Sequence, residues 1–506
     1  MHRVGNGFPV RSLFECHGPG RELRQSILNK CRTAEFAGGM ANAALSPQTS
    51  KSNFYERGWL ARVGGRKTLL CKRPHALILA MRVAGLFTIP TALAYAGTDK
   101  AKLSADVQTS RPSIWDQKYM FGDWGGERSR LADKGVTFDL NNIGDYQGSV
   151  TGSQHNETAY FGRFRASADI DFNKLSEFDG EFFFSGVWQY GQNLSARYLH
   201  VNTLVSSIAG VESVRVDQLW YQQGLFQHRV TDKLGQVVAV NEFGATDFFD
   251  LLVNDELGYA PNALFNAKQP FSPAGKPGVI VWGDLSVVTP GLYAKAGVFA
   301  AYDNPYRPDD YGVDYTDDFK HGAVVSFEAG YQEQNKNYSG VYKVGINVNN
   351  LAVYSNPDTG VNYRGNFTAY GLAEKTVYHP TAESGKLDKN KGLDLLLEFV
   401  GAPGDRNPLE FEVTAGTRYT GLIPGRDLDK TGFGVIYSRN GYAYSDANEA
   451  THGNSLGGET TLELTYQINP LSWFSLQFDN QFIIDPGGDD QRSGILVLGL
   501  RTIFRF

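Results

Sequence analysis

The sequence predicts an all-β protein, a transmembrane antiparallel β-barrel of about 16 strands preceded by a short helical segment. Three observations predict this fold. Apolar and polar residues alternate along many short segments, and long and short connections alternate between these segments. The chain also holds 26 Tyr, 32 Phe and 57 Gly in 506 residues, yet its mean hydropathy is only -0.32. A barrel explains this composition, because half of its strand residues are polar and its aromatic residues gather at the membrane interfaces.

The first 96 residues differ in composition from the rest of the chain. They hold 14 Lys and Arg, 4 Glu and no Asp, which leaves 34 basic and 50 acidic residues in 97–506. Lys72 and Arg73 precede an apolar run that ends in Ala94-Tyr95-Ala96, which is the order of a secretory signal peptide. A transmembrane helix is the alternative, but a charged residue and a proline interrupt a run of marginal length.

We therefore expect residues 72–96 to be a signal peptide that is cleaved after Ala96. Residues 1–71 are Arg-rich and poor in acids, and we expect a mis-assigned or cleaved N-terminal extension there. An organelle transit peptide has the same composition. All three cysteines precede the cleavage site, so the mature chain would carry no thiol, as suits an exported protein.

Residues 97–134 are expected to form a periplasmic N-terminal segment with a short helix. The stretch "DWGGERSRLADKG" predicts this helix, with Asp123 near its start and Gly135 as its stop. The helix would lie at the periplasmic mouth of the barrel or form a solvated linker. Residues 135–506 would then be the outer-membrane β-barrel.

Alternation and turn residues predict sixteen strands in this barrel. If the first strand runs outward, the connections after even-numbered strands should be short periplasmic turns and the others long external loops. The sequence keeps this rhythm in most places, and a soluble sandwich has no reason to keep it. The approximate strand ranges are 135–150, 156–174, 180–192, 213–226, 234–244, 278–286, 291–302, 321–333, 338–354, 364–378, 391–401, 408–423, 431–445, 458–468, 473–484 and 494–506.

The connection of about 245–277 is unusual among the external loops. Its sequence "TDFFDLLVNDELGYAPNALFNAKQPF" is too apolar for an exposed tip. Long loops with structure of their own are usually functional. We expect this loop to fold inward and narrow the lumen, and packing between subunits is the competing explanation.

Several blocks of the chain are similar to the carbohydrate-selective porins of the Gram-negative outer membrane, the OprB-like family. The resemblance covers about residues 114–506, with its blocks in the same order. These blocks are "FGDWGGERSRLADKGVTFDL", "GRFRASADIDFNKL", "QLWYQQGLF", "TGLIPGRDLDKTGFGVIYSR" and "ETTLELTYQINPLSWFSLQFDNQFIIDPGG". The resemblance implies a sixteen-stranded channel for the passive diffusion of monosaccharides, with glucose the usual substrate, and no cofactor.

The resemblance also implies partners for the chain. Phe506, at the end of the last alternating strand, resembles the signal by which the barrel-insertion machinery recognises outer-membrane barrels. The expected partners are then monosaccharides, outer-membrane lipid and this machinery, with no nucleic acid. Whether the chain is a monomer or a homotrimer stays open, and the N-terminal extension departs from the family pattern.

Two strands carry charged residues with the spacing of one strand face. Four of these residues stand at odd-numbered positions, so their side chains would point to the same face of a strand: Arg163, Arg165, Asp169 and Asp171. They must face the lumen, because an Arg at mid-bilayer costs about 2–4 kcal/mol. We expect them to replace the hydrogen bonds between sugar and water during passage. The alternative is that they pair with neighbouring strands and stiffen the wall.

The stretch "SVRVDQLWYQQ" offers a second set of lumen candidates. On a regular strand, the side chains of Arg215, Asp217 and Tyr221 would point to one face, and that of Trp220 to the opposite face. Trp220 could stack on a sugar, but a position at the membrane interface is the favoured interpretation.

Other classes of function fit the sequence less well. An enzyme would need a nucleophile and a base in reach of each other, and no such motif, phosphate-binding loop or metal-ligand cluster stands out. An acidic, β-rich secreted lectin is the main alternative to a channel.

Overall fold

The computed structural model describes residues 113–506 except 153–155, 177, 211, 258–265, 303–310 and 317. The expected extension at 1–71, the signal peptide at 72–96 and the beginning of the 97–134 segment lie outside the described residues.

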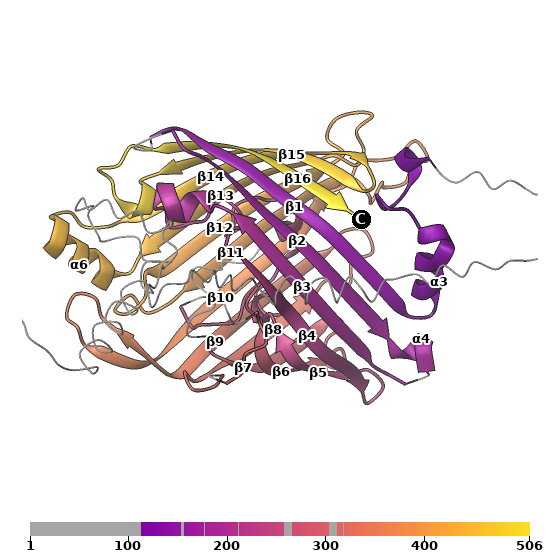
Figure 1. Cartoon of the computed structure of the whole chain (residues 1–506), viewed down its shortest axis with the longest axis horizontal. Coiled ribbons are helices and arrows are strands. Elements are labelled where there is room, and N and C mark those ends of the chain that lie inside the picture. Colours follow the sequence, from indigo (N-terminus) through magenta and orange to yellow (C-terminus); the bar gives the residue numbers. More distant parts are fainter. Residues whose placement is uncertain are drawn as a thin grey trace, which may run out of the picture. The chain divides into compact units, whose positions relative to one another are not determined.

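Within these residues, sixteen antiparallel strands close into one barrel (Figure 1). Each strand pairs with its neighbours in sequence, and β1 closes the barrel by pairing with β16. The predicted fold class is therefore confirmed. The strands are β1 (Val136–Thr151), β2 (Thr158–Asp171), β3 (Glu181–Gly191), β4 (Ser213–Leu225), β5 (Val230–Val237), β6 (Lys276–Asp284), β7 (Leu292–Ala300), β8 (Ala323–Gln332), β9 (Gly340–Ser355), β10 (Asn362–Tyr378), β11 (Gly392–Gly401), β12 (Leu409–Thr420), β13 (Lys430–Asn440), β14 (Gly458–Leu471), β15 (Phe474–Ile484) and β16 (Ile495–Arg505).

The two ends of the barrel differ in their connections. The end that carries the C-terminus of β16, at the right of Figure 1, has short connections such as 226–229 and 472–473, and we call it the turn end. The opposite end, which we call the loop end, has the long connections 192–212, 238–275 and 441–457. The predicted alternation of long and short connections is thus present.

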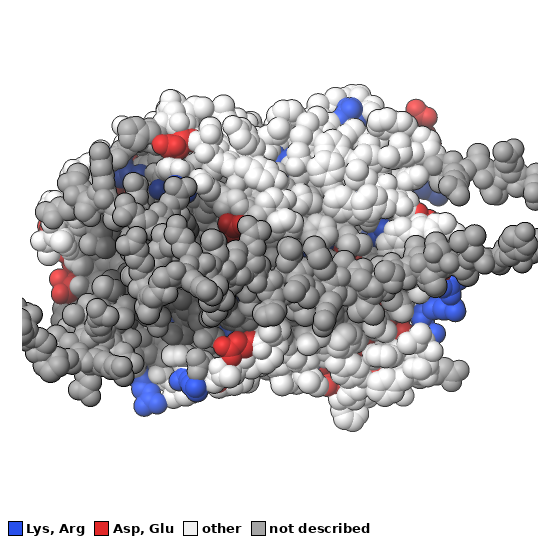
Figure 2. Space-filling view, viewed as in Figure 1, with Lys and Arg blue, Asp and Glu red and all other residues white. Residues whose placement is uncertain are grey.

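Burial along the strands is the reverse of that in a soluble protein. On β14, Leu464 is 52% exposed on the outer face, whereas Glu463 on the opposite face is buried. The same pattern holds on β15, where Phe478 is exposed and Gln477 is buried. On the face drawn in Figure 2, the wall that grey atoms leave visible is mostly free of charged residues. An apolar outside and a polar inside define a membrane barrel rather than a soluble sandwich or a lectin.

The predicted short helix is present at the turn end. Helix α3 (Glu127–Asp133) follows a 3-10 turn, and the Asp123 carboxylate accepts hydrogen bonds from the N–H and hydroxyl of Ser129, both at 2.9 Å. Gly135, with φ of 91°, follows the helix as predicted. The helix is attached to the barrel, because Arg128 donates to the main-chain oxygens of Phe506 at 2.7 Å and Phe138 at 2.8 Å.

The other helices are short. No helix in the described part of the chain is both long and apolar enough to span a membrane. The remaining helical elements are α4 (Phe172–Ser176), α6 (Tyr442–His452), η1 (Ile114–Asp116), η2 (Trp124–Gly126), η3 (Ser195–Leu199), η4 (Ala239–Asn241), η5 (Asp247–Asp250) and η6 (Pro486–Gly488).

Two predicted strands end early in the structure because helices follow them. The strand predicted at 156–174 ends at Asp171, where α4 begins. The strand predicted at 431–445 ends at Asn440 and gives way to α6, which stops at Gly453 with φ of 85°. The alternating aromatic residues of "GYAYSD" made this helix look like a continued strand.

The fifth strand shows the largest displacement. It was predicted at 234–244 but spans Val230–Val237. The apolar residues Val238, Ala239 and Val240 leave the wall and pack with Phe243 and Phe299 in a buried cluster. A short apolar run has no period that separates a strand from a buried loop, and the tertiary packing decides between them.

Candidate functional site in the barrel lumen

The connection 238–275, which we call the inner loop, begins along one side of the wall. The Lys233 ammonium of β5 contacts the Glu242 carboxylate at 2.6 Å. The Gly244 N–H donates to Glu328 of β8 at 2.9 Å, and the Lys343 ammonium of β9 donates to the Ala245 carbonyl at 2.6 Å.

The inner loop then reaches the far wall of the barrel. Its Asp250 carboxylate contacts Arg418 of β12 at 3.2 Å and Lys430 of β13 at 2.7 Å. The N–H groups of Val253 and Asn254 donate to the Glu463 carboxylate of β14 at 2.7 and 2.9 Å. A segment that bonds to β5 and β9 and also to β12 and β14 of a closed barrel must lie inside it.

The apolar side chains of the inner loop explain its position. Phe248, Leu252 and Leu257 are buried against Leu396 and Ile436 of the lumen wall. Burying such side chains stabilises the inward position by about 2 kcal/mol each. The predicted inward fold of the stretch near 245–277 is therefore confirmed, and the loop narrows the lumen.

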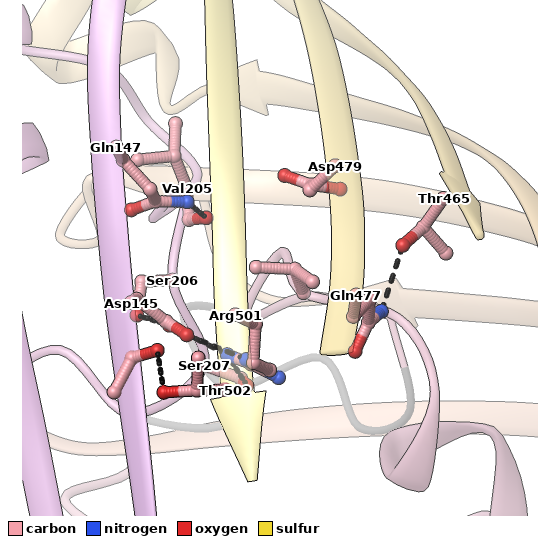
Figure 3. A network of polar contacts seen from close by, with 12 residues as sticks. Asp145, Gln147, Val205, Ser206, Ser207, Thr465, Gln477, Asp479, Arg501 and Thr502 are labelled. Atoms are coloured by element: carbon pink, nitrogen blue, oxygen red, sulfur yellow. Dashed lines mark hydrogen bonds and ion pairs between the residues drawn. The ribbon is translucent and has the colours of Figure 1, made fainter. Parts of the chain in front are cut away.

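The connection 192–212, which we call the companion loop, lies beside the inner loop. Gln147 of β1 donates to the Val205 carbonyl at 2.6 Å, and Ser206 donates to Asp145 at 2.6 Å (Figure 3). The Ser207 N–H donates to the Val253 carbonyl of the inner loop at 2.7 Å. The two loops thus form one layer against the wall of β14, β15, β16 and β1.

A buried ion pair anchors this layer. Arg501 of β16 binds the Asp145 carboxylate through two hydrogen bonds of 2.7 Å and also donates to Ser207 at 3.0 Å (Figure 3). At the edge of the companion loop, Arg492 donates to the His200 carbonyl at 2.8 Å. Burial and the positive charge of Arg492 lower the pKa of His200.

The structure brings four of the predicted site residues together, which are Arg163, Arg165, Arg215 and Asp217. Arg165 donates to Asp217 at 3.0 Å and to Ser272 of the inner loop at 2.9 Å. Arg163 and Arg215 are buried, and their charges act on the same Asp217 carboxylate. Asp217 is fully buried, whereas the Arg165 side chain is 23% exposed. Among these four residues, Arg165 is the one with appreciable access to solvent.

Asp169 and Asp171 lie apart from this group, at the turn end. They line a polar depression of about 460 Å3 together with Glu181, Lys174 and His228. They lie on the same face of β2 as Arg163 and Arg165, because β2 pairs with β1 and β3 without a register shift.

Tyr221 was predicted to face the lumen, but in the structure it lies on the outer face of the barrel. A β-bulge shifts the register between β3 and β4, so that Ser185 pairs with Gln218 and Gly186 pairs with Val216. After the bulge Tyr221 pairs with Phe182 and stacks on Phe178, away from the lumen. Trp220 instead points inward, where the Lys233 ammonium lies 3.8 Å from its ring centroid. A bulge adds one residue to one strand and changes the facing of all that follow.

Most charged residues around the inner loop were not among the predicted site residues. Lys233, Lys295, Lys343, Arg418 and Lys430 carry the positive charges of the wall there, and Glu242 and Asp250 carry the negative charges of the loop. The alternation of side chains along the predicted strands could have placed Arg418 and Lys430 on the lumen face. Nothing in the sequence indicated that the loop carboxylates would meet them.

The chemistry of this interior is that of a wet, charged passage. It offers guanidinium, ammonium, carboxylate, amide and hydroxyl groups, all of which exchange hydrogen bonds with water or with a polar solute. Within the described residues no group of three or more His, Asp or Glu side chains is placed to hold a metal ion.

A closed sixteen-stranded barrel with an apolar outer wall and a polar, loop-narrowed interior is a channel of the outer membrane. The family model for carbohydrate-selective porins of the OprB family matches residues 155–506, and the chain belongs to this family.

The chain is also similar to individual proteins. The chain is 23% identical to Porin B of Pseudomonas aeruginosa over 436 residues, which cover 77% of this chain and 92% of that protein. Its structure is similar to the high-pH structure of Pseudomonas putida OprB, with a TM-score of 0.70 and 22% identity, over 78% of this chain and 100% of the other.

Proposed function

We propose that this porin lets glucose-like monosaccharides diffuse passively across the outer membrane into the periplasm, and that it acts as a channel and not as an enzyme. The loop end would face the exterior and the turn end the periplasm, as in barrels with short periplasmic turns. The observation that carries the proposal is the inner loop, which narrows the lumen and brings charged side chains to the narrowing.

The proposal assigns different roles to the predicted lumen residues. Arg163, Arg215 and Asp217 are buried, and they support the wall and the inner loop. Arg165 is partly exposed beside the loop residue Ser272, so it is the residue of this group that contacts the sugar. Asp169 and Asp171 would meet the sugar later, in the depression at the turn end.

The hydration of the sugar explains why a charged side chain such as Arg165 would help its passage. A neutral sugar that enters the narrowing loses hydrogen bonds to water, and the wall must replace them. A charged donor makes hydrogen bonds about twice as strong as a neutral one. A guanidinium that already holds Asp217 is also fixed in position, so it loses little freedom when the sugar binds.

The outer wall and the C-terminal residue would have partners of their own. Exposed apolar residues such as Leu464 and Phe478 would contact outer-membrane lipid. Phe506 would be read by the insertion machinery before α3 packs against it.

Replacing Arg165 with Gln tests the role of this residue. In planar bilayers, Arg165→Gln should shift the reversal potential toward cations and weaken the block of ion current by glucose. Arg130→Gln is the matched control, because Arg130 is exposed on α3 and pairs with Glu127 there. If Arg165→Gln keeps the wild-type reversal potential and glucose block, Arg165 only fastens the inner loop to the wall.

A further inference from the structure

We propose that the barrel has a second sugar-binding site at the turn end, which accepts a neutral pyranose after it passes the inner loop. We call it the exit site. It is a cavity of about 420 Å3 between the turns 333–339 and 379–391 and the lumen faces of β10, β11 and β12. This inference rests on the proposed function for the identity of the ligand, but apart from Arg418 it concerns residues that lie away from the inner loop.

Two aromatic rings, which we call the aromatic wall, line the exit site. The rings of Tyr338 and His379, which come from the two different turns, stack with centroids 5.6 Å apart and an interplanar angle of 17°. A 2.6 Å hydrogen bond joins His379 Nδ1 to the Lys391 carbonyl and fixes the histidine ring. One face of a pyranose consists of C–H groups, and a flat ring buries that face at little entropic cost.

Polar groups line the cavity beside this aromatic wall. The hydroxyls of Ser339 and Thr376 lie 2.7 Å apart, and Thr376 donates to the Asp394 carboxylate at 2.7 Å. Arg418 donates to the other oxygen of Asp394 at 3.1 Å. Each side chain is held by another protein group and keeps further hydrogen-bonding capacity for the hydroxyls of a sugar.

Three of the five Lys and Arg side chains that line the site are paired with carboxylates, which suits a neutral ligand. Lys375 pairs with Glu333, and Lys391 pairs with Asp427 at 2.7 Å. Arg418 pairs with Asp394 at 3.0 Å. An anion would have to compete for these three cations with carboxylates that are already bound, whereas the exposed Lys336 and Lys389 add positive charge to the lining of the cavity.

The position of the site links it to the narrowing. Arg418 contacts Asp250 of the inner loop and Asp394 of the exit site at the same time. A sugar that leaves the inner loop therefore meets Arg418 first and the aromatic wall next. A volume of about 420 Å3 also lies within the range of small-molecule sites, about 300–1,000 Å3.

Side-specific current block in planar bilayers tests the exit site. Glucose is added to the turn-end side alone or to the loop-end side alone of channels of known orientation. For the variant with Tyr338→Ala and His379→Ala, the half-blocking glucose concentration from the turn end should rise about fivefold. Block from the loop end and the ion conductance should stay close to wild type.

Three controls separate the effect of the aromatic wall from general effects on the channel. Tyr342→Ala removes a ring that stacks on Tyr331, with centroids 6.3 Å apart, on the outer wall of the same region, and it should leave glucose block unchanged. Mannitol has hydroxyls but no ring face, so its block should be the same in the double variant and in wild type. Tyr338→Phe keeps the ring and should behave as wild type.

The outcomes distinguish this inference from the proposed function. Equal glucose block from the turn end in wild type and the double variant overturns the exit site and leaves the sugar channel intact. A wild-type channel that glucose blocks from neither side overturns both. An equal loss of glucose and mannitol block in the double variant would show a change of pore shape and would also overturn the exit site.

Discussion

The anchor of the companion loop allows a quantitative prediction. Asp145 is 2% exposed and Arg501 is 5% exposed, and two hydrogen bonds of 2.7 Å join them. Asp145→Asn removes the negative charge and leaves the guanidinium buried, which usually costs about 3–5 kcal/mol. Asp479 and Glu463 also attract Arg501. We therefore expect about 3 kcal/mol, a shift of roughly 150-fold in the unfolding equilibrium.

Guanidinium unfolding of the detergent-solubilised barrel measures this cost. Folded and unfolded bands on a gel without boiling give the free energy of unfolding. Asp139→Asn is the matched control, because Asp139 lies on the same strand and face but is exposed and bonds to Asn141. The control should lose less than about 0.5 kcal/mol.

A double-mutant cycle and a current recording complete the test. With Arg501→Gln added, the double variant should lose clearly less than the sum of the single losses, because each single variant leaves a buried partner behind. Release of the companion loop should also increase current fluctuations in Asp145→Asn. If Asp145→Asn costs no more than Asp139→Asn, the buried pair does not anchor the loop and the reasoning is refuted.

Two further predictions concern the ends of the chain. N-terminal sequencing of protein from outer membranes should give a start at or near Gly97, because a small-x-small site follows an apolar export signal; a mature start upstream of Lys72 would contradict the export signal. Deletion of Phe506 should lower the yield of folded barrel, since α3 loses the main-chain oxygen that Arg128 binds and the insertion signal is gone. Channels that do assemble should keep the wild-type conductance, and equal yields from both chains would count against this role.

The sequence by itself determined where the wall of the barrel lies. Lipid on one side and water on the other impose a period of two on every strand, so the predicted ranges contain most of each observed strand, with the fifth as the main exception. The helix near Glu127 was also readable, because Asp123 and Gly135 mark its ends locally. The inward fold of the inner loop followed from its apolar composition.

The tertiary structure decided which residues meet inside the barrel. Asp145 and Arg501 are 356 positions apart in the chain, and Asp250 and Arg418 are 168 apart. Such pairs exist only because the barrel closes and the loops enter it, and strand periodicity carries no information on either event. The bulge that turns Tyr221 outward and Trp220 inward is likewise a property of the pairing between β3 and β4. The positions of most strands, though not of the fifth, are therefore a local property of the sequence, whereas the chemistry of the lumen depends on contacts between distant segments.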